Sequence, residues 1–361
     1  MALLRACAAA PFAAALRHAR AASSHFLLPP SLFAPATVDP ETAAASAAAV
    51  AASSAAVQSY ELPPAVARAN RLRQIMEEYH AAPAKPERHD RRVSLAGGGH
   101  VDLSIFRPAL RDARGCYLHL HGGGWYSGSA RFQNDVRLGA MAHSLGLAVV
   151  SVDYRLAPEA KWPLPLDDCV AAARWLIDNS RAEFGSSTLL IGGESSGAHL
   201  CAMTLLRLAS EGVQLGGGRP FAAANLVYGI YDLSGTPSVQ HYGARPLIFN
   251  LPDFERCCEL LLPPETSRRS PDVSPLYASP AALRAMPPAL FTIGTDDPLL
   301  DDSMFMAARW AVAGSELAVY PGGAHGIGHF GPHANTALGL KAQARILSFL
   351  QGHIQSSEQR I

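Results

Sequence analysis

The stretch Gly193-Glu194-Ser195-Ser196-Gly197 stands between an apolar segment, residues 187–191, and a segment with helical spacing, residues 197–210. A serine hydroxyl is a poor nucleophile unless the backbone exposes it next to a base. A tight strand-to-helix turn exposes the hydroxyl, and flanking glycines let the strand and the helix approach closely. The alternative is a Gly/Ser turn that only caps a helix. The strand before the motif and the helix after it favour the nucleophile.

A second glycine-rich motif, His121-Gly122-Gly123-Gly124-Trp125, directly follows an apolar strand at residues 115–120. Glycines let backbone N–H groups point at a ligand without obstruction, and acyl transfer needs such donors for the negative oxygen of its tetrahedral intermediate. The alternative is a flexible glycine loop. A phosphate site is disfavoured, because the chain has no G-x-G-x-x-G after a strand and no Gly-Lys-Ser/Thr.

From about residue 91 onward, apolar strands alternate with helices, which indicates an α/β fold with a mostly parallel sheet covered on both faces. Residues 231–285 break the alternation and are too long for an ordinary loop, so we expect an insertion with a short helix at residues 252–262. An amphipathic helix is expected at residues 64–79. The expected strands are 92–95, 100–106, 115–120, 147–152, 187–191, 221–228, 288–293 and 316–320.

The composition argues against several classes of function. Thirty Lys and Arg balance thirty Asp and Glu, and this net charge of +0 disfavours binding to nucleic acid or to anionic membranes. No apolar run approaches the roughly 20 residues that span a bilayer, so stable membrane insertion is not expected. None of the six cysteines forms a C-x-x-C pair, which disfavours a zinc ribbon or a thioredoxin-type site.

Residues 1–59 differ from the rest of the chain, with 23 alanines and five charged residues, none of them acidic before Asp39. This composition is typical of an organelle transit peptide; a secretory signal fits less well, because Pro11 interrupts the apolar run. A disordered Ala-rich extension is slightly favoured over both. We therefore expect a cytoplasmic protein, with mitochondrial targeting through residues 1 to about 35 as the alternative, and we expect residues 1–59 to be dispensable for activity.

Three motifs occur in order: His121–Trp125, Asp153-Tyr-Arg-Leu-Ala-Pro-Glu159 and Gly193–Gly197. Together they resemble the hormone-sensitive-lipase-like (bacterial carboxylesterase) family of α/β-hydrolases, α/β-hydrolase fold-3, over about residues 60–351. The resemblance implies an eight-stranded, mostly parallel sheet with helices on both faces, and a helical cap from about residues 60–88 and 231–285. It also implies a Ser–Asp–His triad in that chain order. We also expect residues 352–361 to form a polar tail.

His325 is the expected general base, since that role needs a pKa near the working pH and favours histidine. It stands in Pro321-Gly-Gly-Ala-His-Gly326, just after the last expected strand, where the resembled family places its base. His329 is a minor alternative. A metal site of His325, His329 and His333 would need a regular helix, which the glycines and the proline between them oppose.

Asp297 is the expected acid that orients the base. It stands in Gly294-Thr-Asp-Asp-Pro-Leu299 after a strand, and the family's Asp-Pro-Leu motif matches it. The alternative is a helix N-cap, because Asp before Pro is well suited to that role. Its acidic neighbours, expected to be capping or surface residues, are Asp296, Asp301 and Asp302.

The expected activity is that of a serine hydrolase, a carboxylic ester hydrolase that cleaves short-chain esters through an acyl-enzyme intermediate. An amidase or N-deacylase could use the same triad. A non-catalytic binder, like the plant gibberellin receptors that resemble this family but have lost the triad histidine, is disfavoured because His325 is present. A metallohydrolase is the last alternative. No metal or organic cofactor is expected; the expected partner is a small-molecule ester, and a homodimer is left open.

Six further residues complete the expected site. The backbone N–H groups of Gly123, Gly124 and Ser196 would form the oxyanion hole. The resembled family more often has Ala at position 196 and Asp at position 194, but the oxyanion contact comes from the backbone. The residues expected to line the substrate pocket are Trp125, Tyr126 and Glu194.

Overall fold

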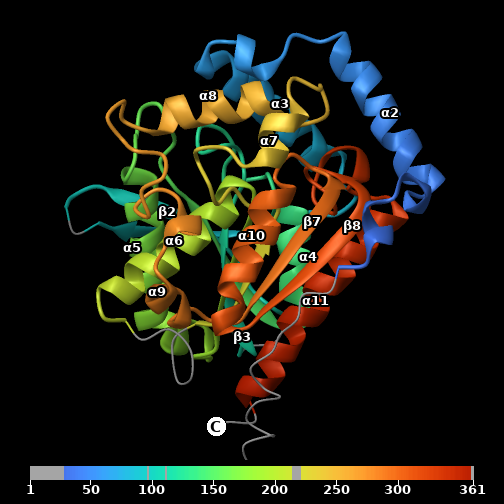
Figure 1. Cartoon of the computed structure of the whole chain (residues 1–361). Helices are drawn as coiled ribbons and strands as arrows, with labels where there is room; N and C mark the ends of the chain where they lie inside the picture. Colours follow the sequence, from blue (N-terminus) through green and yellow to red (C-terminus); the bar gives the residue numbers. More distant parts are fainter. Residues whose placement is uncertain (1–27, 96, 110–111, 214–220, 359–361) are drawn as a thin grey trace, which may run out of the picture. The chain divides into compact units, whose positions relative to one another are not determined.

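The computed structural model describes residues 28–95, 97–109, 112–213 and 221–358 (Figure 1). The chain divides into two compact units, residues 1–30 and 31–361, and the second unit contains the whole sheet. Eight strands form this sheet in the order β1-β2-β4-β3-β5-β6-β7-β8. They are β1 (His89–Ser94), β2 (His100–Phe106), β3 (Gly115–Leu120), β4 (Leu147–Asp153), β5 (Leu189–Glu194), β6 (Phe221–Val227), β7 (Ala289–Asp296) and β8 (Ser315–Ala324).

The sheet is parallel except at one edge, where β2 runs antiparallel to both β1 and β4. Every residue of β3 and β5 is buried. A strand covered on both faces cannot alternate apolar and polar residues, which explains the continuous apolar runs of the sequence. The predicted eight-stranded, mostly parallel sheet is confirmed.

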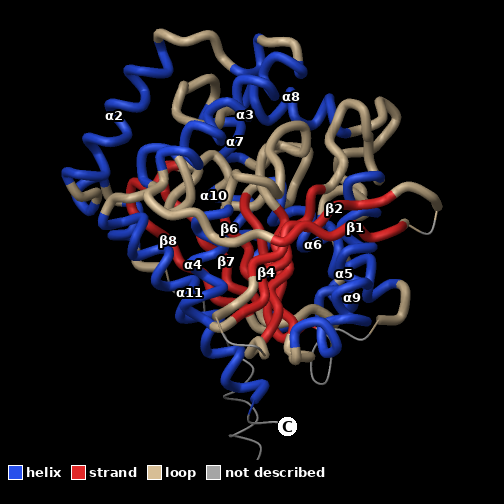
Figure 2. The backbone as a smooth tube through the Cα atoms, turned by 180° about the vertical axis from the view of Figure 1, so that it is seen from behind, coloured by secondary structure: helices blue, strands red, loops and turns tan. Residues whose placement is uncertain are grey.

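Helices cover both faces of the sheet. Figures 1 and 2 show α5, α6 and α10 on one face and α4 and α11 on the other, in agreement with the strands that each helix contacts. Strand β5 leads directly into α6, which places Ser195 between them. The helices described are α2 (Pro40–Ser54), α3 (Pro64–Ala81), α4 (Asp135–Leu145), α5 (Leu164–Phe184), α6 (Ser196–Ser210), α7 (Pro237–Tyr242), α8 (Leu251–Leu261), α9 (Pro280–Arg284), α10 (Leu300–Trp310) and α11 (Ala337–Glu358), and the 3-10 helices are η1 (Pro30–Phe33), η2 (Pro35–Thr37), η3 (Ser59–Glu61), η4 (Pro275–Tyr277), η5 (Ala311–Ala313) and η6 (Gly331–His333).

Helices α3, α7 and α8 gather at one end of the sheet (Figure 1). The helix expected at residues 252–262 is present as α8, and the one expected at residues 64–79 is present as α3. The guanidinium of Arg68 on α3 donates from Nε to the carbonyl oxygen of Tyr126 at 2.8 Å, and Ser59 Oγ donates to Asp253 on α8 at 2.6 Å. These contacts join the segment before the sheet to the insertion and to the glycine loop.

The expectation of a disordered extension is wrong for residues 40–54, which form α2. Asp39 caps this helix, since its carboxylate accepts the N–H of Thr42 at 2.8 Å, and Pro40 occupies the first helical position. Alanine is the strongest helix former and is small enough for close packing. The same composition that indicated low complexity therefore supports a packed helix. Residues 1–27, which hold most of the expected targeting segment, lie outside the described residues.

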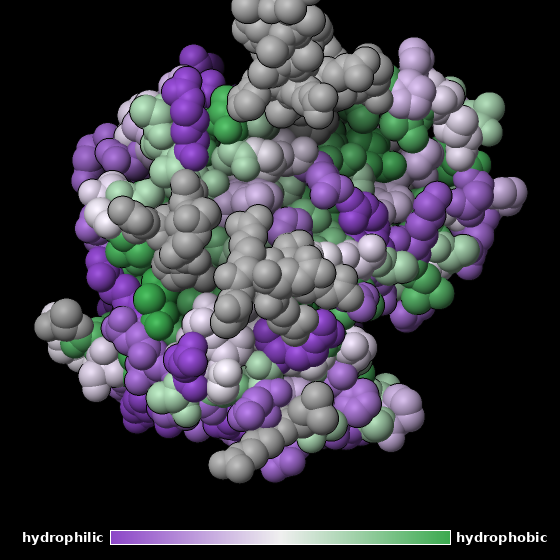
Figure 3. Space-filling model, turned by 90° about the horizontal axis from the view of Figure 1, so that it is seen from below, coloured by the Kyte–Doolittle hydropathy of each residue, from purple (hydrophilic) through white to green (hydrophobic). Residues whose placement is uncertain are grey.

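Other expectations concern the ends and the surface of the chain. The last helix, α11, continues to Glu358, so most of the expected polar tail is helical. Among the described residues, no helix is long and apolar enough to cross a membrane. Figure 3 views the molecule from the end opposite α8 and shows hydrophilic side chains spread across that face, with smaller hydrophobic groups between them.

Candidate active site

Ser195 lies at the turn between β5 and α6 with a φ of 56°, a left-handed conformation that is strained for residues other than glycine. Two backbone hydrogen bonds hold this turn: Ser195 N–H donates to Val227 at 2.9 Å, and His199 N–H donates to Ser195 at 3.2 Å. A Cβ added at Gly197 would lie 2.0 Å from the carbonyl oxygen of Leu120. The predicted tight turn is present, and glycine lets it approach β3.

His325 and Asp297 complete a chain of hydrogen bonds with Ser195. Nε2 of His325 is 3.1 Å from Oγ of Ser195, and Nδ1 is 3.0 Å from Oδ2 of Asp297. Ser195 is 6% exposed, His325 3% and Asp297 2%. Such an arrangement can remove the serine proton and hold the resulting imidazolium against a carboxylate. The structure therefore brings together the three residues that the sequence analysis selected.

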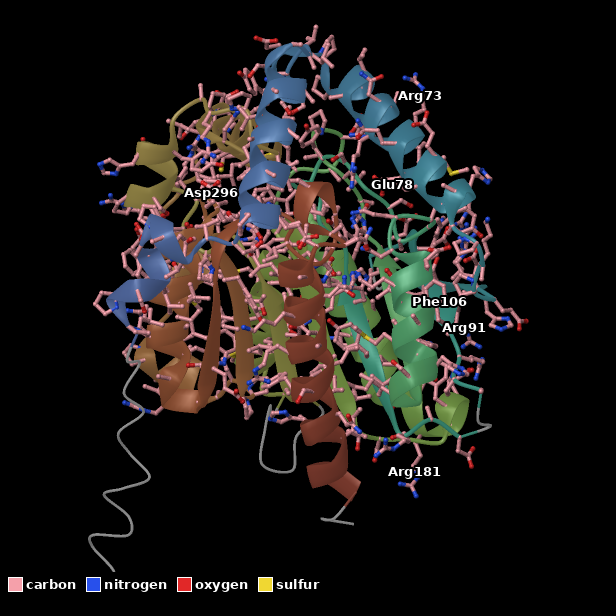
Figure 4. All side chains as sticks on the ribbon, turned by 90° about the vertical axis from the view of Figure 1, so that its right-hand side faces the viewer. Arg73, Glu78, Arg91, Phe106, Arg181 and Asp296 are labelled. Carbon is pink, nitrogen blue, oxygen red and sulfur yellow. The ribbon has the colours of Figure 1, made fainter. Side chains whose placement is uncertain are left out.

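The neighbouring acids have other partners. Asp296 pairs with Arg245 at the surface, near the end of β7 (Figure 4). Asp301 accepts a backbone N–H of α7 at 2.8 Å, and Asp302 accepts two backbone N–H groups of residues 231–232 at 2.6 and 2.9 Å. Among the hydrogen bonds of the described residues, none joins these acids to His325.

The glycine loop lies against the nucleophile. A Cβ added at Gly122 would lie 3.5 Å from Cβ of Ser195. Within the described part of the chain, the N–H groups of Gly123 and Gly124 have no hydrogen-bond acceptor. Ser196 is the first residue of α6, where an N–H group has no partner inside the helix. These N–H groups have the free hydrogen-bonding capacity that an oxyanion hole needs, and the hole itself stays a prediction.

Trp125 does not line a pocket, because its side chain is 0% exposed. Its indole Nε1 donates to Nδ1 of His199 at 3.1 Å, and Nε2 of His199 donates to the carbonyl oxygen of Val273 at 2.8 Å. Burial lowers the pKa of His199 to about 4, which keeps the ring neutral for this pair of bonds. Trp125 therefore fixes the glycine loop to α6 and to the insertion. Tyr126 is half-buried beside Gly124, and its contact with substrate stays a prediction.

Glu194 is 4% exposed and lies in a buried polar cluster, and its contact with substrate stays a prediction. Its carboxylate pairs with the guanidinium of Arg137, lies 3.1 Å from Nε2 of His119 and 3.6 Å from Nε2 of His329. Burial alone would raise the pKa of Glu194, but Arg137 and His119 hold it well below its ordinary value. Burial and Arg137 lower the pKa of His329 to about 3, so that ring is neutral. His329 is thus part of this cluster, not the partner of Ser195.

A cavity of about 840 Å³ lies between α3, α4 and α11. Its wall includes Arg137, His329 and Glu78, and Figure 4 labels Glu78 on α3. Ser195 is not among the described residues that line this cavity. Two members of the Glu194 cluster, Arg137 and His329, thus line this cavity. The only sequence signal for the cluster was the glutamate at position 194, where the resembled family more often has aspartate.

Aromatic rings pack against His325, and the carboxyl group of Asp253 interacts with it electrostatically; the sequence predicted neither. The ring of Phe249 stacks on His325 with 5.0 Å between centroids, and that of Tyr228 meets it edge-on at 4.8 Å. Burial raises the pKa of Asp253 to about 6, although its hydrogen bond from Ser59 opposes the rise. Phe249 and Asp253 lie in the insertion; the helical pattern of residues 252–262 predicts α8 there but does not show which of its side chains approach His325.

A serine turn after β5, with an aspartate after β7 and a histidine after β8 on a mostly parallel sheet, defines a serine hydrolase of the α/β-hydrolase class. A sequence family described as alpha/beta hydrolase fold matches residues 117–329. The chain belongs to this family, in its hormone-sensitive-lipase-like branch.

Curated relatives and solved structures agree with this assignment. The chain is 32% identical to an ethyl acetate hydrolase of Pseudomonas putida over 65% of this chain and 74% of the relative. It is 31% identical to the carboxylesterase NlhH of Mycobacterium tuberculosis over 73% of this chain and 82% of the relative. A thermostable esterase from Pseudomonas putida has a similar fold, with a TM-score of 0.77 over 88% of this chain and 98% of that one, at 22% identity.

Proposed function

We propose that the protein is a carboxylic ester hydrolase that cleaves short-chain esters through an acyl-enzyme intermediate. The observation that carries the proposal is the position of His325, whose Nε2 is 3.1 Å from Ser195 while its Nδ1 is 3.0 Å from Asp297. Relatives named as an ethyl acetate hydrolase and a carboxylesterase support the substrate class.

The first step forms the acyl-enzyme. Nε2 of His325 accepts the proton of Ser195 as Oγ attacks the ester carbonyl carbon, and the carbonyl electron pair moves to oxygen. The N–H groups of Gly123, Gly124 and Ser196 stabilise that oxyanion. When the tetrahedral intermediate collapses, the bond to the alcohol oxygen breaks, and His325 returns its proton to the leaving alcohol. Asp297 stabilises the imidazolium during this interval.

The second step hydrolyses the acyl-enzyme, with water as the nucleophile and Ser195 as the leaving group. Nε2 of His325 accepts a proton from water, whose oxygen attacks the acyl carbon. The same N–H donors hold the second oxyanion. Collapse breaks the bond between Oγ of Ser195 and the acyl carbon, and His325 returns the proton to Oγ. The products are a carboxylic acid and free enzyme, so this chain's own groups suffice for every proton transfer.

Short acyl chains fit the surroundings of the site. Ser195 is only 6% exposed, and Phe249 and Tyr228 crowd His325 from two sides. The insertion of residues 231–285 contains short helices and no long amphipathic lid of the kind that would open on a lipid surface. We therefore propose no activation by emulsified substrate.

A chain-length series of p-nitrophenyl esters tests the proposal. We expect kcat/KM to be highest for the shortest acyl groups and to fall with length, without stimulation by emulsified triglyceride. The Ser195→Ala variant should keep its circular dichroism spectrum and lose on the order of 10⁴–10⁶ in turnover. Turnover of that variant within tenfold of wild type would reject Ser195 as the nucleophile.

The amidase alternative has its own test, which compares a phenyl ester with the matching anilide. Faster turnover of the ester supports the esterase. Faster turnover of the anilide would keep the triad but change the substrate class to amides.

A further inference from the structure

A second buried histidine, His333, holds the backbone next to His325. The N–H of Ala324, the residue before His325, donates to Nδ1 of His333 at 2.9 Å. A backbone N–H can only donate, so Nδ1 carries no proton, and the neutral ring has its proton on Nε2. His333 is 1% exposed, and burial lowers its pKa, which favours this neutral form.

The other nitrogen of the same ring reaches α2, nearly 300 residues away in the sequence. Nε2 of His333 lies 3.2 Å from the carbonyl oxygen of Thr42 and 3.1 Å from Oγ of Ser46, so its proton has acceptors on α2. Thr42 is 0% exposed and Ser46 is 8% exposed. One imidazole thus connects the amino-terminal helix to the backbone that carries His325.

The first turn of α2 and the residues just before it make further contacts on both sides of His325. Glu41 accepts the N–H of Ala337, the first residue of α11, at 3.1 Å. A Cβ added at Gly322 would lie 2.4 Å from Cγ1 of Val38, so this backbone and the chain before α2 touch closely. Figures 1 and 4 both show α2 beside the end of β8. These contacts keep α2 in place over the loop.

The hydrogen-bond acceptor for the N–H of Ala324 is His333 and not a neighbouring strand. Strands β7 and β8 shift register between Gly294 and Asp296, just before Asp297 and His325 leave the sheet. At a register shift the regular ladder is locally disrupted. The acceptor for the N–H of Ala324 comes from the imidazole of His333, and the loop between them, residues 324–333, is closed by that bond.

We propose that His333 is a positioning residue for His325, and that α2 fixes the ring of His333 in the orientation this role requires. The inference rests on the proposed esterase function, because it assigns a catalytic consequence to the position of His325. It gives the amino-terminal segment a part in catalysis, although no described residue of that segment forms a hydrogen bond with Ser195, His325 or Asp297.

Two substitutions of His333 separate its two nitrogens in the full-length chain. Asparagine places an oxygen near the position of Nδ1, so His333→Asn can still accept from Ala324 but does not reach α2. Glutamine places its amide near the position of Nε2, so His333→Gln can still reach α2 but loses the acceptor for Ala324. We expect His333→Gln to lose at least about tenfold in kcat with KM within about twofold, and His333→Asn to stay within about threefold.

The melting temperatures separate positioning from a purely structural role. Both variants should melt below wild type, so an effect on stability alone would lower kcat in the same order as the melting temperature. The exposed His143→Asn variant on α4 is the control and should change neither quantity. A kcat for His333→Gln within twofold of wild type, or kcat losses that simply follow melting temperature, would overturn the role of His333.

A double-mutant cycle tests the role of α2. Asp39→Ala removes the cap of α2 at the surface, and we expect it to lower kcat about twofold to threefold in the wild-type background. In the His333→Asn background it should have no effect on kcat, because asparagine does not reach α2. Equal losses in the two backgrounds would overturn the connection through the ring.

Amide hydrogen exchange distinguishes a failure of this inference from a failure of the proposed function. The N–H of Ala324 should be protected in wild type and in His333→Asn and should exchange faster in His333→Gln, whatever the enzyme hydrolyses. If Ser195→Ala keeps its turnover, the proposed function fails, and the exchange result still decides whether His333 holds Ala324. Unchanged protection in His333→Gln would reject the hydrogen bond itself.

Discussion

Asp297 reaches Nδ1 of His325 at 3.0 Å with a carboxylate that also accepts the N–H of Leu299 at 2.9 Å. The bond from Leu299 orders the turn before α10, and the bond with His325 orients the imidazole. The N-cap of α10 is Leu299, with no side-chain cap bond, so the N-cap alternative for Asp297 is wrong. The geometry is the one that the predicted triad requires. A carboxylate fixed by its own backbone turn has little freedom to rotate away from the imidazole, which favours a permanently oriented base.

The first prediction follows from this double role. Asp297→Asn should lose on the order of 10³–10⁴ in kcat for a short p-nitrophenyl ester, because the amide lacks the charge that stabilises the imidazolium and can favour the wrong tautomer. Its amide oxygen can still accept from Leu299, so the circular dichroism spectrum and melting temperature should change little. Asp296→Asn, whose wild-type carboxylate pairs with Arg245, is the matched control and should be nearly normal. The reverse order of activities would identify the wrong acid.

The sequence was sufficient for the features that depend on local pattern. The order of apolar strands and helices predicts the sheet, and the turns around Ser195, Asp297 and His325 each follow a strand. Parallel strands end at the same edge of a sheet, so residues that follow them meet there. The triad could therefore be selected without knowledge of any side-chain contact.

The features that the sequence did not predict depend on which distant side chains pack together. Trp125 was assigned to the substrate pocket, but its indole finds a hydrogen-bond partner in His199, 74 residues later. The low complexity of residues 40–54 suggested disorder. That inference failed because composition does not show that His333 offers a buried hydrogen-bond donor to α2. Local periodicity carries no information about such pairings, and a large buried aromatic residue looks the same as a pocket residue in a sequence.

The second prediction concerns pH and His199. Burial lowers the pKa of this ring from its ordinary 6.5 to about 4 in the folded protein. A folded-state pKa below the unfolded one means that the unfolded chain binds the proton first. The stabilisation is therefore complete above pH 6.5 and is lost as the pH falls toward 4. Between pH 7 and pH 5, His199 should remove about 2 kcal/mol from the free energy of unfolding.

Urea unfolding at the two pH values checks this. The His199→Asn variant keeps an acceptor for Trp125 and has no titrating ring, so its loss of stability between pH 7 and pH 5 should be about 2 kcal/mol smaller than that of wild type. Equal losses in the two proteins would mean that His199 titrates alike in the folded and unfolded states.

The third prediction concerns the buried pair of Arg137 and Glu194. Arg137→Leu leaves the carboxylate of Glu194 buried without its main cation, and removing one partner of a buried pair costs about 3–5 kcal/mol. Arg174→Leu is the control, because its pair with Glu211 is solvent-exposed and such pairs contribute about 0–1 kcal/mol. Urea unfolding at pH 7 should show the large difference between them. Similar small losses in both would mean that water or His119 compensates the charge of Glu194.

The last prediction revises the view that residues 1–59 are dispensable. A chain that begins at Ser31 keeps α2, and its kcat/KM for a short ester should lie within about twofold of the full-length value. A chain that begins at Tyr60 lacks the acceptors for Nε2 of His333 and the hydrogen bond from Ser59 to Asp253. A buried donor without a partner costs about 1–3 kcal/mol, so this chain should melt at a lower temperature.

Catalysis should suffer in the same chain. Without α2 the ring of His333 can rotate or take up the other tautomer, and the backbone before His325 then loses its fixed acceptor. We expect kcat to fall about threefold to tenfold, equivalent to roughly 0.7–1.4 kcal/mol in the activation free energy, with KM changed less. Steady-state kinetics of the chains beginning at Ser31 and Tyr60, measured well below both melting temperatures, decide the matter. Equal kcat values for the two would show that α2 packs on the loop without acting on His325, and that the whole segment before Tyr60 can be removed.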